Sequence, residues 1–356
     1  MALQPDAMGD LVTTTLRKYG RNRWTDLSTS LREFSAYPAM VKQGKKMLES
    51  DGIGYQFFLQ KAGTSTYTRT GLFQNDGALN AQDVMTSGFV PWRGSMNYYI
   101  FDLQEPVLNS GESRLVDEIL ARRHKCWMDI ATGFEIDFWT PLTSSTDTEK
   151  PYPVPCYIVQ SATDSTEALG VTGGNPSGFT SGIAGIDSTS VTQWGNWSKK
   201  YKDITFPDCV TKLREAYVMC DFKSPVPQPP GYNTGDDWGI YCPYDNIAQM
   251  EGLLRTQNDN LGYDIASTDG KTTFRGVEMH RVSLLATEAT LASTKPFYGI
   301  NWGNYHPKFL EGWFMKDSGV KPAPDAHNVV RAFIDNRFAY VCENRRNQFV
   351  VYYSAS

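Results

Sequence analysis

The chain has 356 residues, of which 40% are hydrophobic, 13% aromatic and 21% charged, and its formal net charge at pH 7 is −5. This composition excludes an intrinsically disordered chain, and the length allows one elongated or two ordinary domains with a substantial core. The charges are dispersed and their balance is negative, which argues against a dedicated nucleic-acid-binding surface.

The first predicted elements are an arm and a long hairpin. Residues 1–50 are polar with short helical patterns, notably at 24–34, and predict an extended arm. Residues 52–62 and 84–103 are rich in β-forming residues and bracket a polar, glycine-containing stretch, which predicts a hairpin. Two arms of about 16 residues would reach roughly 50 Å, well beyond the roughly 20 Å radius of gyration of a compact chain of this length.

Both faces of the predicted second arm carry apolar side chains. Phe89, Tyr99 and Phe101 lie on one parity, and Trp92, Tyr98 and Ile100 on the other. A protruding two-stranded ribbon has little of its own to cover either face. We therefore expect neighbouring molecules to cover the hairpin.

The remaining elements alternate between helices and strands. The best helical pattern covers residues 112–139, which would be about 40 Å long and would stop before Pro141. Further along the chain, the patterns predict a strand at 156–160, helices at 208–222 and 245–261, and strands within 275–287, 295–305 and 329–354.

Residues 173–197 (GGNPSGFTSGIAGIDSTSVTQWGNW), here called the Gly-rich loop, contain six glycines and no lysine. They fit neither the P-loop nor the GxGxxG pattern, so a nucleotide site is disfavoured. Glycines alternate with bulky residues, which are Ile183, Ile186, Trp194 and Trp197. This pattern predicts special backbone dihedrals pinned by large side chains, and hence a shaped loop rather than a tether.

Other patterns argue against catalysis, metal binding and membrane insertion. The six cysteines lack CxxC spacing and are expected to be buried free thiols. The four histidines are far apart and lie outside the HExxH and GxSxG motifs, so we expect no catalytic, cofactor-binding or metal site. The sequence has neither a membrane-spanning run nor an N-terminal signal pattern, which predicts a soluble chain made inside the cell, with no membrane partner.

The order of these elements resembles the major capsid proteins of tailed bacteriophages, which have the Hong Kong 97-like fold. The resemblance rests on GIAGID at 182–187 with Trp194 and Trp197, on TKLREAYVMC at 211–220, and on residues 297–301 followed by NRRNQ at 344–348. It covers almost the whole chain.

The resemblance implies an α+β fold with five parts. These are an N-terminal arm (1–50), an extended E-loop hairpin (51–104), the spine helix with the first part of the peripheral domain (105–154), an axial domain (155–328), and return strands of the peripheral domain (329–356). It also implies a non-enzymatic protein made in the host cytoplasm. Such a protein self-assembles into hexamers and pentamers of an icosahedral virion shell around double-stranded DNA, without sequence-specific contact. The implied further partners are a separate scaffolding protein, a portal and a possible cement protein.

Three groups of residues are the candidate assembly contacts. The hairpin tip, with Tyr67, Arg69, Leu72 and Phe73, is expected to grip a neighbouring subunit. The Gly-rich loop is expected to be an inter-subunit or surface loop through Gly182, Ile183, Gly185, Asp187, Trp194 and Trp197. Arg345 and Arg346 would form a solvated turn in a single chain and lattice charges in a repeated assembly.

Two alternatives remain open. An encapsulin-like shell with the same fold would enclose an enzyme instead of a genome. A carbohydrate-binding or carbohydrate-hydrolysing protein would use aromatic side chains and a carboxylate pair, for which Glu135 with Asp137, or Asp236 with Asp237, are candidates.

Overall fold

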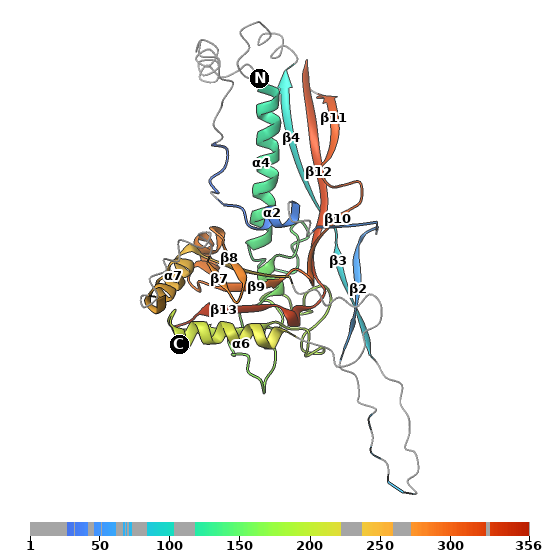
Figure 1. Cartoon of the computed structure of the whole chain (residues 1–356). Coiled ribbons are helices and arrows are strands. Elements are labelled where there is room, and N and C mark those ends of the chain that lie inside the picture. Colours follow the sequence, from blue (N-terminus) through green and yellow to red (C-terminus); the bar gives the residue numbers. More distant parts are fainter. Residues whose placement is uncertain are drawn as a thin grey trace.

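The computed structural model describes residues 27–31, 33–41, 46–50, 52–61, 67, 69, 71–72, 84–102, 118–221, 237–258, 272–324 and 328–355. In this part of the chain, helices and strands form two larger sheets and a two-stranded ribbon. Helix α4 (Glu118–Trp139) runs beside strands β4 and β12, whereas helices α6 and α7 lie toward the other end of the molecule (Figure 1). The predicted α+β class is confirmed.

Helix α4 confirms the long helix predicted over residues 112–139, within the part that is described. Its buried stripe consists of residues four positions apart, Cys126, Ile130, Phe134 and Phe138, each at most 6% exposed. This spacing puts all four side chains on one face of a helix. The stripe packs on aromatic residues of the first sheet, with Phe134 4.8 Å from Phe338 and Phe138 5.1 Å from Tyr340 between ring centroids.

The first sheet has the order β1-β10-β12-β11, and β4 also pairs with β12. Its strands are β1 (Met47–Glu49), β4 (Arg93–Asp102), β10 (Tyr305–Leu310), β11 (Lys316–Pro322) and β12 (Val329–Cys342). In β12, burial alternates as far as Phe338 and then becomes continuous through Cys342. The first part of the strand is therefore covered on one face only, and its last part, from Phe338 to Cys342, is covered on both faces in the main core. The sequence patterns predicted β12 but not β10 or β11.

The second sheet has the order β5-β13-β9-β6-β8-β7. Its strands are β5 (Trp197–Tyr201), β6 (Trp238–Cys242), β7 (Thr273–Phe274), β8 (Val277–Arg281), β9 (Phe297–Asn301) and β13 (Phe349–Tyr353). Helix α6 (Thr211–Cys220), preceded by the π-helix η1 (Phe206–Val210), and helix α7 (Tyr244–Asn258) share a second hydrophobic core with this sheet. Both helix predictions are confirmed within the described residues.

The predicted hairpin is confirmed only in part. Strands β2 (Gly54–Gln60) and β3 (Met85–Pro91) pair antiparallel, with Gly54 opposite Pro91. The expectation that residues 84–103 form a single arm is wrong, because the chain passes the buried Trp92 and enters β4. Strand β4 then pairs with β12 from Arg93 to Asp102. Trp92 and Phe101 are buried within their own chain, whereas Phe89, Tyr98 and Ile100 stay 46%, 52% and 43% exposed.

Three local predictions are also wrong. The described residues of the expected helix at 24–34 are not helical, and helix α2 (Ala36–Val41) follows them. The expected strand at 156–160 begins instead within the helical turn α5 (Val154–Tyr157), which follows the extended Pro153. The predicted strand at 275–287 ends at Arg281, and α8 (Leu284–Thr287) and α9 (Ala289–Ala292) follow as single helical turns.

The start of α2 is fixed by a carboxylate from α4. Buried Glu135 accepts hydrogen bonds from the backbone N–H groups of Ala36 (2.9 Å) and Tyr37 (3.0 Å) and from the indole of Trp139 (3.0 Å). A carboxylate stabilises a helix N-terminus by accepting its unpaired N–H groups. Glu135 is therefore a structural cap, which removes it from the carboxylate pair considered for a carbohydrate-active protein.

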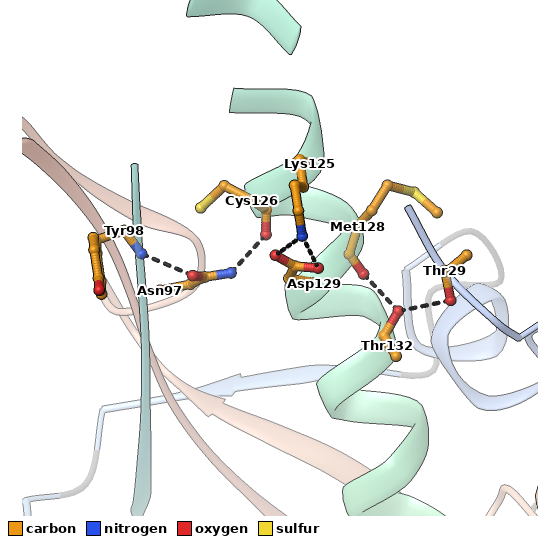
Figure 2. A network of polar contacts seen from close by, with 8 residues as sticks. All are labelled: Thr29, Asn97, Tyr98, Lys125, Cys126, Met128, Asp129 and Thr132. Carbon is orange, nitrogen blue, oxygen red and sulfur yellow. Dashed lines mark hydrogen bonds and ion pairs between the residues drawn. The ribbon is translucent and has the colours of Figure 1, made fainter. Parts of the chain in front are cut away.

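Helix α4 also connects the N-terminal segment with β4. Figure 2 shows Asn97 of β4 pointing at α4, where its Nδ2 donates to the Cys126 carbonyl oxygen (2.9 Å). One turn and a half further along the helix, the hydroxyl oxygens of Thr132 and Thr29 are 3.3 Å apart. Two segments that are distant in the sequence are thus held on one helix.

Candidate assembly interface

The two faces of the hairpin base differ in burial. Phe57 and Val90 face the body of the molecule and are 5% and 1% exposed. Phe58, Met85 and Phe89 face away and are 66%, 54% and 46% exposed. Because side chains alternate along a strand, the exposed Gln56, Gln60 and Ser87 share this face. The open face therefore combines three large apolar side chains with three polar ones, as on a surface that another molecule covers.

The predicted tip residues lie in solvent where they are described. Tyr67 and Leu72 are 79% and 95% exposed. Arg69 is exposed as well, whereas Phe73 lies outside the described residues. Their role in gripping a neighbour stays a prediction.

The hairpin base is attached to the Gly-rich loop. The backbone N–H of Phe89 donates to the carbonyl oxygen of Ala184 (2.9 Å), and the Phe57 ring lies 5.9 Å from the Trp194 ring. Figure 1 shows β2 and β3 leaving one edge of the body. The Gly-rich loop therefore supports the point at which the hairpin leaves the body.

The shape of the Gly-rich loop depends on left-handed backbone conformations. Gly182, Ala184 and Gly185 have φ values of 74°, 57° and 75°. A Cβ atom at Gly182 would lie 1.9 Å from the carbonyl oxygen of Ile186, so only glycine fits there. The prediction of special dihedrals is confirmed, and the tight turn places the Ala184 carbonyl beside β3.

Most bulky residues of the Gly-rich loop belong to the core. Ile183 is fully buried, and Trp194 and Trp197 are each 3% exposed. The expectation that these three side chains form a surface or inter-subunit contact is wrong, because they pack inside their own subunit. Gly185 is exposed, and Gly182 and Asp187 are half-buried, so only these three of the six candidates reach the surface.

Asp187 organises the exposed side of the Gly-rich loop. Its carboxylate accepts hydrogen bonds from the Thr189 hydroxyl (2.5 Å), the Thr189 backbone N–H (2.9 Å) and Asn175 Nδ2 (2.7 Å). These bonds hold the pKa of Asp187 below its usual value, with the Thr189 hydroxyl contributing most. Asp187 therefore fixes the conformation of the loop from within.

Arg345 is an internal support rather than a lattice charge. It lies in the short 3-10 helix η3 (Arg345–Asn347), is fully buried, and stacks over the Trp194 ring at 5.6 Å. Its guanidinium donates to backbone carbonyl oxygens of Tyr157 (2.7 Å), Trp194 (3.2 Å), Gly173 (3.1 Å) and Gly174 (2.6 Å). Burial lowers its pKa to about 10, which leaves it charged at neutral pH.

The expectation of a solvated turn is thus wrong for Arg345. The contacts that overturn it come from segments more than a hundred residues away, which local sequence patterns do not reveal. Arg346 is half-buried, and its role as a lattice charge stays a prediction.

A second polar site at the hairpin base was not anticipated from the sequence. The ammonium group of Lys308, 3% exposed, lies 2.9 Å from Glu49 Oε1, 3.2 Å from Glu343 Oε1 and 3.6 Å from the centre of the Tyr55 ring. The Tyr55 hydroxyl in turn donates to Glu343 Oε1 (2.9 Å). These four residues, here called the Lys308 cluster, join β1, β2, β10 and the end of β12.

The Lys308 cluster keeps its cation charged. Burial disfavours the ammonium form, but hydrogen bonds with Tyr55 and Glu49 and the charge of Glu343 outweigh it, so the pKa of Lys308 is raised. A buried lysine with one carboxylate from the N-terminal strand and one from the core sheet holds both segments beside the hairpin.

One face of β4 is also open. Met96, Tyr98 and Ile100 alternate along the strand and are 63%, 52% and 43% exposed. Tyr98 is 6.1 Å from Phe333 of β12, which extends the apolar surface onto the neighbouring strand. In Figure 2, Tyr98 points away from α4, while Asn97 points toward it. The sheet therefore presents a second apolar surface, on the side opposite α4.

The described residues give no direct indication of metal chemistry. All six cysteines are buried free thiols, as predicted. Among the described side chains, no group of three or more His, Cys, Asp or Glu residues could hold a metal ion. In the same part of the chain, no helix combines the length and apolarity needed to cross a bilayer.

Comparison with known proteins gives structural matches only. No protein-family model and no curated protein sequence matches the chain. The cyanophage A-1(L) capsid asymmetric unit matches with a TM-score of 0.61 and 12% identity, over 93% of this chain and 96% of that chain. The capsid of an empty GTA particle matches with a TM-score of 0.57 and 9% identity, over 95% and 97% of the two chains.

A third match is the cyanophage Pam1 capsid asymmetric unit, with a TM-score of 0.51 and 12% identity over 95% of this chain and 97% of that chain. The chain therefore has the fold of proteins that build capsids. The resemblance inferred from the order of sequence elements is confirmed at the level of fold.

Proposed function

We propose that this chain is the major capsid protein of a tailed bacteriophage. It self-assembles into hexamers and pentamers, and these form the icosahedral shell around the double-stranded DNA genome. The observation that carries the proposal is the fold similarity to capsid asymmetric units over more than nine-tenths of both chains.

The exposed apolar surfaces support self-assembly. The open face of the hairpin base and the open face of β4 together expose six large apolar side chains, Phe58, Met85, Phe89, Met96, Tyr98 and Ile100. Large apolar side chains that gather on an exposed face commonly mark a protein interface. In this proposal, copies of the chain cover both faces, and the hairpin tip reaches an adjacent subunit.

The proposed division of the chain keeps the boundaries that the resemblance implies, with one refinement. The arm is 1–50, the E-loop lies within 51–104, the spine helix and first peripheral part are 105–154, the axial domain is 155–328, and the return strands are 329–356. Because β4 pairs with β12, residues 93–102 are assigned to the peripheral sheet and not to the E-loop.

The proposed partners follow from the shell. They are copies of the chain, a separate scaffolding protein, a portal, a possible cement protein, and packaged DNA held without sequence-specific contact. The formal charge of −5 supports the last point, because sequence readers generally present a basic surface. The proposed location is the virion capsid, after synthesis in the host cytoplasm.

The test is assembly of the purified chain, alone and with a candidate scaffolding protein, followed by negative-stain electron microscopy. Closed particles of uniform diameter are expected, and deletion of residues 64–80 should give soluble subunits that form none. A variant in which 64–80 are replaced by a Gly-Ser linker of equal length separates loss of the tip side chains from loss of reach. A wild-type chain that stays monomeric under all conditions would overturn the proposal.

The contents of the particles separate the two kinds of shell. Particles purified from infected cells should contain double-stranded DNA. Particles that hold an enzyme and no nucleic acid would instead indicate an encapsulin-like compartment.

A further inference from the structure

A cavity of about 400 Å³ opens in the helical part of the molecule that packs on the second sheet. Its floor is apolar and consists of the buried side chains of Val210, Met250, Phe274 and Met279. Its rim includes Phe206, Arg214, Leu253 and Arg275. We call it the α6–α7 cavity. Its volume is within the range of sites that bind small molecules.

The rim of the cavity is cationic. The Arg214 guanidinium stacks on the Phe206 ring at 4.7 Å, and the Arg275 guanidinium stacks on the Tyr217 ring at 5.0 Å. Within the described residues, neither guanidinium has a carboxylate partner. The nearby carboxylate of Glu251 already accepts a hydrogen bond from the Thr272 hydroxyl (2.6 Å). The cavity therefore suits an apolar group that has a carboxylate next to it.

The same chain presents such a pair of groups on a turn. Leu169 is 63% exposed, and Glu167, two residues before it, is exposed as well. Two hydrogen bonds close the turn: the Gly170 N–H donates to the Thr166 carbonyl (2.7 Å), and the Leu169 N–H donates to the Thr166 hydroxyl (3.2 Å). Buried Ser165 fixes the turn to β5 by donating its N–H to the Ser198 carbonyl (2.7 Å).

Leu169 is 63% exposed on a hydrogen-bonded turn, so it has no role in the core of its own chain. Its exposure also shows that it does not occupy the α6–α7 cavity of its own chain. Because hydrogen bonds already hold the backbone of the turn, a partner that covers Leu169 orders little more than its side chain.

We propose that Leu169 of one subunit inserts into the α6–α7 cavity of a second copy, where the carboxylate of Glu167 lies beside Arg214 and Arg275. Two different surfaces of the chain meet in this contact, so it is heterologous. Heterologous contacts generate closed rings when the rotation between copies closes. The inference rests on the proposed self-assembly, and it names a side-chain contact that holds neighbouring copies together.

Charge exchange tests the contact. E167R and R275E should each lower the yield of closed particles at least about tenfold, because each places like charges together at the rim. The double variant E167R/R275E restores one attractive pair and should recover much of the yield. E149R reverses another exposed glutamate on a surface turn and is the matched control, expected to assemble normally. Thermal unfolding of the unassembled subunits should be similar for all four variants.

Cross-linking tests the contact independently of shell formation. The variant L169C/L253C, treated with a mild oxidant, should give disulfide-linked dimers and larger species on non-reducing gels, and neither single variant should. The six natural cysteines are buried, which keeps the background low.

The outcomes separate this contact from the proposed function. Normal particles from E167R, or no cross-link in L169C/L253C, would overturn the contact while leaving the capsid assignment intact. Loss of assembly in R275E without rescue by E167R would likewise overturn it, since the cavity would then hold something other than Glu167. Cross-linked oligomers from a chain that never forms closed particles would support the contact and overturn the capsid assignment.

Discussion

The backbone N–H of Phe89, in the second strand of the hairpin, donates a 2.9 Å hydrogen bond to the carbonyl oxygen of Ala184, a residue with a positive φ of 57°. Non-glycine residues rarely adopt this conformation, so the surrounding fold must hold it in place. Gly182 and Gly185, which flank the Ile183–Ala184 pair, and the buried side chains of Ile183 and Ile186 do so. The direction in which the hairpin leaves the body is thus set by a loop about a hundred residues away in the sequence.

Alanine substitutions at two adjacent phenylalanines should distinguish the effect on subunit stability from the effect on assembly. F57A should lower the free energy of unfolding by about 3 kcal/mol, because the side chain is 5% exposed and packs on Trp194. F58A should change it by less than about 0.5 kcal/mol, because Phe58 is 66% exposed. Urea unfolding followed by circular dichroism measures both.

In the assembly reaction, F58A should reduce the yield of closed particles even though its subunits are stable. Equal losses of stability in the two variants would show that the hairpin base does not pack on the Gly-rich loop.

The Lys308 cluster should be sensitive to loss of its cation. K308M removes the ammonium group that lies between two carboxylates, and should cost about 3 kcal/mol of unfolding free energy. The neutral triple variant K308M/E49Q/E343Q should recover most of this loss, because no unpaired charge remains. K295M is the control, since Lys295 and Asp245 form an ion pair with side chains 43% and 63% exposed. It should cost less than about 1 kcal/mol. A K308M chain as stable as the wild type would contradict this account.

Arg345 should not be replaceable even by lysine. R345K keeps the charge but cannot reproduce the planar guanidinium that reaches carbonyl groups of four residues, so we expect a loss of about 3 kcal/mol and poor soluble expression. R346K, the adjacent conservative change at a half-buried position, should lose less than about 1 kcal/mol. Similar melting temperatures for the two variants would argue against the internal role of Arg345.

Asp137 and Asp147 should give opposite pH dependences. Burial raises the pKa of Asp137, so the folded state binds more protons than the unfolded state above the usual carboxyl value near 3.8. Stability then falls as the pH rises through this window, and D137N should raise the melting temperature at pH 7 but not at pH 3.

The pKa of Asp147 is lowered by hydrogen bonds from the backbone N–H groups of Lys150 and Glu149. These hydrogen bonds stabilise the folded state when the pH is above the pKa of Asp147 in the unfolded chain. The stabilisation is lost as the pH falls through the lower pKa of Asp147 in the folded chain. D147N should therefore lower the melting temperature at pH 7. Melting curves from pH 3 to pH 7 measure both effects, and a change of the same sign in the two variants would contradict the assignment.

Much of the fold could be predicted from the sequence because the signals are local. The four-residue spacing of Ile130, Phe134 and Phe138 predicts a helix whatever it packs against. The β-rich segments at 52–62 and 84–103 predict a hairpin, of which only 54–60 and 85–91 pair with each other. The glycines of the Gly-rich loop likewise predicted its left-handed turns. The order of these elements was enough to indicate the capsid fold.

The location of the candidate interface depended on contacts that no local pattern contains. From the sequence alone, Arg345 is predicted to be a surface charge, but in the structure it donates to four backbone carbonyl groups from three segments. Trp194 is likewise predicted to be a loop residue at the surface, but in the structure Phe57 packs on it. The sequence of strand β4 is predicted to belong to the hairpin, but in the structure this strand pairs with β12.

By itself, the sequence determined the long helix α4, the helices α6 and α7 and the tight turns of the Gly-rich loop, because these depend on side chains a few positions apart. Only the tertiary structure decided which apolar and charged side chains remain available to another copy. The reason is physical: burial depends on which distant segments pack over a residue, and neighbours in sequence such as Phe57 and Phe58 end on opposite faces of the same strand.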